Sequence, residues 1–247
     1  MSEPVLFSPF QIKSKTLRNR VVLSPMCQYK AENGIVGDWH FQHYSRFAFS
    51  GLGAAFIEAT GVSPEGRIGH GCTGIWNDEQ ISGLSKIVEV FKQYNCVSGI
   101  QLAHAGRKAS FLRPWDGASP LIKYDSKEPA WQTIGPSAVP INDVSPIPKA
   151  MTIEDIDRVK DDFKKAAQRA EKSGFDMIEV HGAHGYLLHS FFSPISNKRT
   201  DKYGGSFENR IRFALEIIGN IKSVWPENKP IFYRLSSVDG VDGGATL

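Results

Sequence analysis

The 247-residue sequence lacks the features that mark several special classes of protein. No apolar run approaches the roughly 18 residues needed to cross a bilayer, and the N-terminal segment has no basic stretch followed by an apolar one. Three cysteines, Cys27, Cys72 and Cys96, are too few and too scattered for a disulfide framework or a zinc cluster. The formal net charge is only +3, and its 29 basic and 26 acidic residues are spread along the chain, which argues against a nucleic-acid partner. We therefore expect a soluble cytoplasmic protein with neither a membrane nor a nucleic-acid partner.

What the chain does contain is an ordinary globular composition, with 41% hydrophobic and 22% charged residues, so a real core is expected. Short β-branched runs alternate along the chain with longer stretches of helical periodicity. The runs are apolar without clean alternation, which is typical of strands covered on both faces in a parallel sheet. We expect such strands over residues 20–26, 54–62, 97–104, 177–183 and 230–236.

Three helices are predicted between these strands. The best defined begins after Thr152, whose hydroxyl and the carboxylate of Asp155 form a capping-box pattern, and it ends at Gly174. The others cover residues 80–94 and the segment from Ser206 to a stop at Pro226. The apolar stripe of the last helix is expected at Ile211, Leu215, Ile218 and Ile221. Strands that alternate with helices in this way predict a parallel α/β fold.

Two parallel architectures fit this alternation: an open doubly wound sheet and a (β/α)8 TIM barrel. No G-x-G-x-x-G follows the first strand, which argues against a dinucleotide-binding open sheet. Polar residues instead follow the strands at the end where a barrel builds its active site. These residues are Cys27, Thr60, Gln101, His104, His181 and Arg234. We predict one domain over residues 1–247 that forms an incomplete barrel of about five strand–helix units, with a long loop and a short hairpin in residues 108–149.

The first candidate for chemistry is the segment S-P-M-C-Q-Y after the first predicted strand. Residues two apart in an extended chain point to the same side, so the thiol of Cys27 and the phenol of Tyr29 would face one pocket. A buried cysteine beside a packing tyrosine has the same spacing. Spacing alone therefore leaves a structural and a functional interpretation open.

The second candidate is H-G-A-H-G-Y after the fourth predicted strand. His181 and His184 cannot share one face of a continuous strand, but they converge if the chain turns there, as the two glycines of the segment allow. Two imidazole N–H groups can stabilise negative charge on one carbonyl oxygen, and the Tyr186 hydroxyl can act as a general acid. A purely structural histidine pair is the alternative. His189 follows, but H-E-x-x-H and a carboxylate at ligand spacing are absent, so no metal site is predicted.

Two further candidates are single residues at strand ends. The amide of Gln101 can pair with a heterocycle edge through both its donor and its acceptor. Arg234 supplies a permanent cation that can stabilise an anionic ring. Each residue is equally well explained as a polar anchor for a loop.

Taken together, these residues resemble the Old Yellow Enzyme family of FMN-dependent ene-reductases, also described as NADH:flavin oxidoreductases. The similarity extends over essentially the whole chain, with matching segments at residues 17–29, 58–67 and 101–109. It is most specific over residues 180–210, which read V-H-G-A-H-G-Y-L-L-H-S-F-F-S-P-I-S-N-K-R-T-D-K-Y-G-G-S-F-E-N-R. Cys27 and Tyr29 are similar to the residues of the bacterial subgroup that carries a thiol next to the flavin.

The resemblance implies a binding site for FMN. Gln101 would pair with the pyrimidine edge of the flavin, and Arg234 would face the part of the ring that becomes anionic on reduction. The Cys27 thiol would lie near the reactive end of the ring and tune its redox potential. The residues implied to bind the cofactor are Ser24, Pro25, Met26, Cys27, Gly61, Gln101 and Arg234.

On the substrate side, the resemblance implies that His181 and His184 hold a carbonyl oxygen and that Tyr29 shapes the pocket. Tyr186 would donate a proton to the α-carbon of the substrate. The implied reaction has two halves, in which NADPH or NADH gives a hydride to FMN and the C=C bond of an α,β-unsaturated carbonyl compound then accepts it. The small-molecule partners would be the nicotinamide and an enone.

The sequence departs from this family in its length. Full-length members continue through strands six to eight, whose loops often hold the cofactor phosphate in barrels of this type, and they are expected to be homo-oligomers. Two functions therefore remain open. One is an FMN-dependent NADPH dehydrogenase, and the other is a catalytically inactive truncated remnant that lacks the FMN phosphate site.

Overall fold

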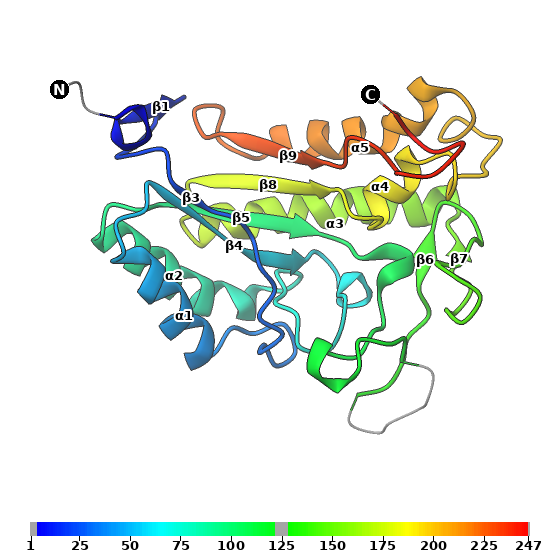
Figure 1. Ribbon diagram of the computed structural model, residues 1–247, viewed down its shortest axis with the longest axis horizontal. Coiled ribbons are helices and arrows are strands. Elements are labelled where there is room, and N and C mark those ends of the chain that lie inside the picture. The colour runs from blue at the N-terminus through cyan, green and yellow to red at the C-terminus, as the bar shows by residue number, and fades with distance from the viewer. Residues whose placement is uncertain (1–3, 122–127, 247) are drawn as a thin grey trace.

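The computed structural model of the protein describes residues 4–121 and 128–246. Its centre is a parallel sheet with the strand order β3 (Val22–Leu23), β4 (Ala54–Gly61), β5 (Val97–Ala103), β8 (Met177–Gly182) and β9 (Ile231–Leu235) (Figure 1). Each strand is added to the same edge in chain order. A doubly wound sheet would reverse its strand order at a switch point, so this order is that of a (β/α)8 barrel.

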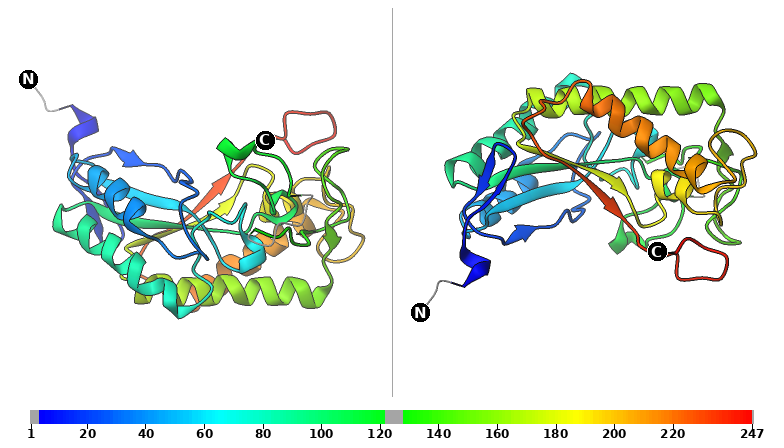
Figure 2. Two further views of the ribbon diagram at one scale, coloured as in Figure 1. Left: turned by 90° about the horizontal axis from the view of Figure 1, so that it is seen from below. Right: turned by 90° about the horizontal axis from the view of Figure 1, so that it is seen from above.

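The helices between the strands cover the outer face of this sheet. They are α1 (Asp38–Ala48), α2 (Ile81–Gln93), α3 (Ile153–Lys172) and α5 (Phe207–Lys222). Figure 2 shows α2, α3 and α5 along one side of the curved sheet, while the opposite, concave side carries none of them. The main core lies between sheet and helices, where Phe91, Phe163 and Phe213 are fully buried.

The three predicted helices are confirmed as α2, α3 and α5, and most of their observed ends lie within one or two residues of the predicted ones. The capping box of α3 is formed, since the Thr152 hydroxyl accepts from the Asp155 amide at 3.2 Å and the Asp155 carboxylate accepts from the Thr152 amide at 3.0 Å. Gly174, with φ of 91°, ends the helix as expected. The helix α5 begins after Ser206, whose side chain accepts from the Asn209 amide.

Several elements were not anticipated from the sequence. They are α1, the short helix α4 (Leu187–Phe192) and an antiparallel hairpin of β1 (Phe10–Ile12) and β2 (Lys15–Leu17). The helix α1 was not predicted because two of its three buried residues, His40 and Tyr44, are not aliphatic and so give no apolar stripe in the sequence. Single 3-10 turns lie at Val5–Phe7, Pro64–Gly66, Asp78–Gln80, Gly106–Lys108 and Pro114–Asp116.

The short hairpin expected within residues 108–149 is present as an antiparallel bridge between Phe111 and Pro120, flanked by hydrogen bonds from the Leu112 amide to the Ser119 carbonyl and from the Leu121 amide to the Ser110 carbonyl. The same part of the chain also forms a parallel pair of β6 (Ile134–Gly135) and β7 (Lys149–Ala150), which was not predicted. One prediction about a helix face was wrong. Leu215 was placed on the buried stripe of α5, yet it is 58% exposed. The helix carries two apolar stripes, and the one that packs on the core contains Phe213 and Ile217 as well as the predicted Ile221. No described helix is long and apolar enough to span a membrane.

The concave face and the edges of the sheet expose apolar surface. An apolar groove of about 290 Å³ lies at the amino ends of the strands, with Phe56, Met177 and Phe232 among its walls. Among the described residues, the edge strands β3 and β9 each pair with one strand of this sheet, and Val22 and Leu235 on them are 42% and 54% exposed. Unpaired edges beside apolar surface promote association between copies.

We therefore predict that the 247-residue chain self-associates in solution. Sedimentation velocity over a range of concentrations should show species larger than a monomer. Replacing Val22 and Leu235 by lysine should shift the distribution toward the monomer, because charges on edge strands oppose pairing. A wild-type chain that stays monodisperse and monomeric at high concentration would contradict this prediction.

Candidate active site

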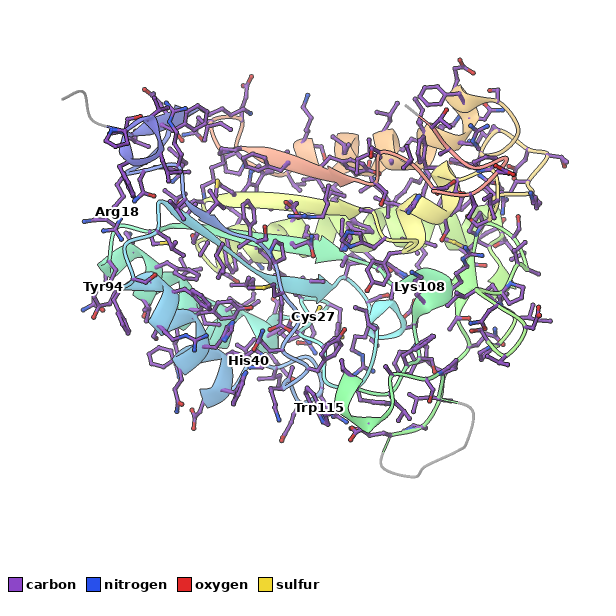
Figure 3. All side chains as sticks on the ribbon, viewed as in Figure 1. Arg18, Cys27, His40, Tyr94, Lys108 and Trp115 are labelled. Atoms are coloured by element: carbon purple, nitrogen blue, oxygen red, sulfur yellow. The ribbon has the colours of Figure 1, made fainter. Side chains whose placement is uncertain are left out.

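The register of the sheet brings the predicted residues to the carboxyl end of the strands. Gln101 on β5 lies beside Glu179 on β8, and His181 on β8 lies beside Arg234 on β9. Since side chains alternate along a strand, Glu179 and His181 share one face of the sheet. Cys27 lies close to the carboxyl end of β4 in Figure 3. The predicted gathering of Cys27, Gln101, His181 and Arg234 at one end of the sheet is therefore what the structure shows.

His181, His184 and Tyr186 form a compact cluster after β8. The ring centroid of His181 lies 5.1 Å from that of His184 and 4.9 Å from that of Tyr186. The ring centroids of His184 and Tyr186 are 6.4 Å apart. The chain turns at His184 and Gly185, whose φ angles are 61° and 75°. The expected turn is present, although its first left-handed residue is the histidine itself. Gly182 is needed for a different reason, because a Cβ there would clash with the hydroxyl of Tyr233.

This histidine turn is held by side chains from other parts of the chain. The His184 amide donates to the Ser236 hydroxyl at 3.0 Å, and the Gly185 amide donates to Nδ1 of His189 at 2.7 Å. Because Nδ1 of His189 is an acceptor, its Nε2 carries the proton and donates to Oδ1 of Asp239 at 2.8 Å. The last described segment thus fixes the backbone that carries His184.

The space beside the turn is a polar pocket of about 470 Å³, large enough for a small ligand. Its walls include Lys108, His184 and Asp239. The ammonium group of Lys108 donates to the His184 carbonyl at 2.7 Å and lies 5.8 Å from the ring centroid of Tyr186. Lys108 was not a predicted site residue, and it adds a positive charge beside both candidate side chains.

Burial sets the protonation of the two deepest groups. Burial, followed by the nearby His184 and Arg234, lowers the pKa of His181 to about 3, so its imidazole is neutral at pH 7. Nδ1 of His181 accepts from the Ala183 amide at 3.3 Å, which leaves the proton on Nε2 as a donor. Burial also raises the pKa of Tyr186, so its phenol keeps its proton at neutral pH.

The low pKa of His181 predicts a pH dependence of stability. The unfolded chain binds a proton near pH 6.5 and the folded chain only near pH 3, so the unfolded state binds more protons between these values. Stability should therefore fall as the pH is lowered through this window, by about 1.4 kcal/mol per pH unit from this residue.

The matched comparison is His181→Gln, which retains a polar side chain but does not titrate. Urea unfolding at pH 6.5, 5.5 and 4.5 should show a shallower loss of stability in the variant by about that amount per pH unit. The other titrating groups are common to both proteins, so their contributions to the pH dependence cancel in the difference between the two. Equal slopes for the two proteins would refute the low pKa.

The side chains of Cys27 and Tyr29 are hydrogen-bonded to each other, but the backbone at Tyr29 is not extended as predicted. Tyr29 has a φ of 53°, and a hydrogen bond between the two side chains partly offsets the effect of burial, which raises the pKa of the Cys27 thiol. Glu58 lies behind this segment and accepts from the Gln28 amide at 2.9 Å and from the Tyr44 hydroxyl at 3.2 Å. Burial raises the pKa of Glu58 to about 7. Because burial raises its pKa, the Cys27 thiol is neutral at pH 7, which distinguishes it from a reactive thiolate.

The remaining residues predicted to bind the cofactor are Ser24, Pro25, Met26 and Gly61. Ser24 is exposed, Pro25 is half-buried and Met26 is 48% exposed. Gly61 is buried at the end of β4, and a Cβ there would lie 3.3 Å from Cγ of Arg67. The backbone oxygen of Ser63 would lie at the same distance, so an alanine at this position would require both the Arg67 side chain and the backbone to shift slightly.

Gln101 and Arg234 are linked by a residue that the sequence analysis did not select. The Gln101 amide donates to Oε1 of Glu179 at 2.5 Å, and Nε of Arg234 donates to the same oxygen at 2.7 Å. Glu179 precedes His181 by two residues, so the strand period of two could have identified it. Glu58 could have been noticed as the acidic residue inside an apolar run. No local pattern connects Asp239 to the histidine turn.

Comparisons with known proteins agree with this geometry. A sequence profile of the group described as the NADH:flavin oxidoreductase / NADH oxidase family matches residues 5–247. An NADPH dehydrogenase of Bacillus cytotoxicus is 47% identical over 244 residues, which are 98% of this chain and 65% of that protein. An NADPH dehydrogenase of Geobacillus thermodenitrificans is 44% identical over 245 residues, which are 98% of this chain and 66% of that protein. The chain thus spans somewhat less than two thirds of the length of these relatives.

Solved structures are similar over the same extent. The Old Yellow Enzyme from Pichia sp. AKU4542 matches with a TM-score of 0.84 at 32% identity and covers 98% of this chain and 62% of that one. Morphinone reductase in complex with tetrahydroNAD matches with a TM-score of 0.83 at 29% identity and covers 99% of this chain and 67% of that one. Together with the curled parallel sheet, these matches confirm the predicted α/β class and the incomplete (β/α)8 barrel.

Proposed function

Because the chain belongs to the NADH:flavin oxidoreductase / NADH oxidase family, we propose that it supplies the catalytic face of an FMN-dependent oxidoreductase. The proposed enzyme oxidises NADPH or NADH and reduces the C=C bond of α,β-unsaturated carbonyl compounds. One observation carries this proposal: the rings of His181, His184 and Tyr186 lie 4.9 to 6.4 Å apart, at the end of the sheet that also holds Gln101 and Arg234.

The donors and acceptors of the described residues fit a flavin ring. The pyrimidine edge of a flavin presents both a donor and acceptors, and the buried amide of Gln101 offers the complement. Arg234 adds a permanent positive charge beside it, suited to a ring that becomes anionic. Cys27 contributes a neutral thiol, in keeping with its raised pKa. FMN, when bound, supplies the hydride transfer between the nicotinamide and the alkene.

The two histidines bind and polarise the substrate. The neutral imidazole of His181 donates from Nε2, and His184, turned toward it by the left-handed backbone, offers a second N–H. Two donors aimed at one carbonyl oxygen stabilise the negative charge that develops there when a hydride reaches the β-carbon.

Tyr186 completes the reduction by donating a proton. Its raised pKa keeps the hydrogen on Oη at neutral pH, where it is available to the α-carbon of the substrate. The ammonium group of Lys108 lies near the ring and favours the phenolate that remains after transfer. Solvent then restores the proton, which balances the reaction.

Isotope labelling tests this division of roles. The FMN-loaded protein is given NADPH deuterated at C4 and 2-cyclohexenone, and the product is examined by NMR. Deuterium from the nicotinamide is expected only at the β-carbon, and in D₂O with unlabelled NADPH it is expected only at the α-carbon. A protein that fails to take up FMN, or a product without label at the β-carbon, would contradict the proposal.

A further inference from the structure

Glu179 lies between the two side chains that are proposed to face the two parts of the flavin ring. It is 8% exposed, and it is flanked in register by Gln101 on β5 and Phe232 on β9. Oε1 accepts from both Nε2 of Gln101 at 2.5 Å and Nε of Arg234 at 2.7 Å, while Oε2 lies 3.3 Å from Nη2 of Arg234. One carboxylate therefore joins a neutral amide and a cation at the floor of the candidate site.

The first consequence concerns the orientation of the Gln101 amide. A carboxylate only accepts hydrogen bonds, so Glu179 must face the NH₂ group of Gln101. The Gln101 side chain is 3% exposed, and turning the amide over would place two oxygens against each other without water to separate them. The carbonyl oxygen of Gln101 is thereby kept free to accept from a ligand.

The second consequence concerns the charge of Arg234. Two of its nitrogens are bound to Glu179, so the guanidinium group is fixed in place and its charge is partly balanced. The third nitrogen, Nη1, is not used in this pair and remains a donor. A ligand that becomes anionic would experience the field of the pair and not that of a bare cation.

We propose that Glu179 is a positioning residue that fixes the amide orientation of Gln101 and moderates the charge of Arg234 toward the flavin. This inference rests on the proposed function, since it assigns Glu179 a role relative to FMN. Glu179 itself touches neither substrate nor the reacting atoms in this arrangement. Its influence passes through the two side chains that it holds.

The first experiment uses the chain without FMN, so it does not depend on the proposed function. In the wild type, the side-chain N–H signals of Gln101 and Arg234 should exchange slowly with solvent in NMR spectra. In Glu179→Gln, both should exchange faster by a factor on the order of ten or more, as expected when hydrogen bonds to a charged acceptor are lost. Unchanged exchange in a folded variant would overturn the positioning role.

The matched control is Asp176→Asn, which removes one negative charge just before the amino end of the same strand. Asp176 lies three residues before Glu179 and is bonded to Ser98 and Lys15, and none of the hydrogen bonds found among the described residues joins it to Gln101 or Arg234. This control should leave the Gln101 and Arg234 signals unchanged. Faster exchange in both variants would mean a general loosening of the sheet and would count against a specific role of Glu179.

The second experiment measures the reduction potential of bound FMN. Glu179→Gln should favour the reduced over the oxidised flavin by a factor on the order of ten, equal to about 30 mV for a two-electron couple. Asp176→Asn should leave the potential at the wild-type value. Glu179→Asp keeps the charge but is shorter, so it should stay near the wild-type potential while losing protection of the Gln101 amide.

These outcomes separate the inference from the proposed function. A wild type that takes up no FMN contradicts the proposed function, and the exchange experiment still decides the positioning role. Bound FMN with equal potentials in the wild type and Glu179→Gln overturns the moderating role while the proposed function stands. If Glu179→Gln does not fold, Glu179→Asp supplies the exchange test, and an amide signal as protected as in the wild type would contradict the inference.

Discussion

Replacing both His181 and His184 by alanine should reduce the rate of alkene reduction by FMN-loaded protein by at least about 10²- to 10³-fold. The loss of one donor in a site that stabilises an oxyanion has a cost of this size, and the double variant removes both imidazoles of the turn. FMN should remain bound, because neither ring contacts Gln101 or Arg234 through a hydrogen bond among those found in the described residues. Stopped-flow absorption of the reduced protein mixed with an enone measures the effect.

The control for this pair is His43→Ala. His43 lies on α1 against the rings of Tyr44 and Phe47, away from the histidine turn. It should leave the rate of alkene reduction unchanged. An alkene reduction rate in the double variant within a few-fold of the wild type would show that the carbonyl oxygen is held by other groups.

Replacing Tyr186 by phenylalanine should slow reoxidation of the flavin by an enone by about 10²- to 10⁴-fold, the usual contribution of a positioned proton donor. Reduction of the flavin by NADPH requires no proton from this residue and should proceed at nearly the wild-type rate. Binding of a carbonyl ligand should also persist, since both histidines remain. The two half-reactions are measured separately by stopped flow.

Tyr94→Phe is the matched control for this substitution. Tyr94 directly follows α2, is 40% exposed and packs on Phe49. The loss of the Tyr94 hydroxyl should change the rate of neither half-reaction. If Tyr186→Phe slowed flavin reduction as much as flavin reoxidation, the residue would be shaping the nicotinamide pocket, and its assignment as proton donor would be wrong.

The parts of the fold that follow from local periodicity were predictable. The buried strands β4, β5 and β8 are largely apolar runs without clean alternation, and α3 has both a capping box and a terminal glycine. Periodicity could not decide which of two apolar stripes of α5 packs on the core, and Leu215 was misplaced for that reason. Proline and glycine likewise predicted an irregular segment after β5 but not the parallel pairing of β6 with β7.

The candidate site likewise contains residues that the sequence could reveal and residues that it could not. His181, Gln101 and Arg234 were found because polar residues at strand ends stand out against apolar runs. The convergence of His184 required a turn that the glycines made plausible. The supporting residues are different, because Glu58, Glu179 and Asp239 act through contacts between distant segments. Such contacts depend on register and packing, which the sequence pattern does not specify.

In the function that we propose, this chain carries the site where a nicotinamide reduces a flavin and the flavin reduces an alkene. The most direct test is an anaerobic titration of the purified protein with FMN bound. Adding NADPH should bleach the flavin absorption, and adding 2-cyclohexenone should restore it with formation of an equal amount of cyclohexanone. A protein that binds no FMN, or a bleached flavin whose absorption the enone does not restore, would contradict the account.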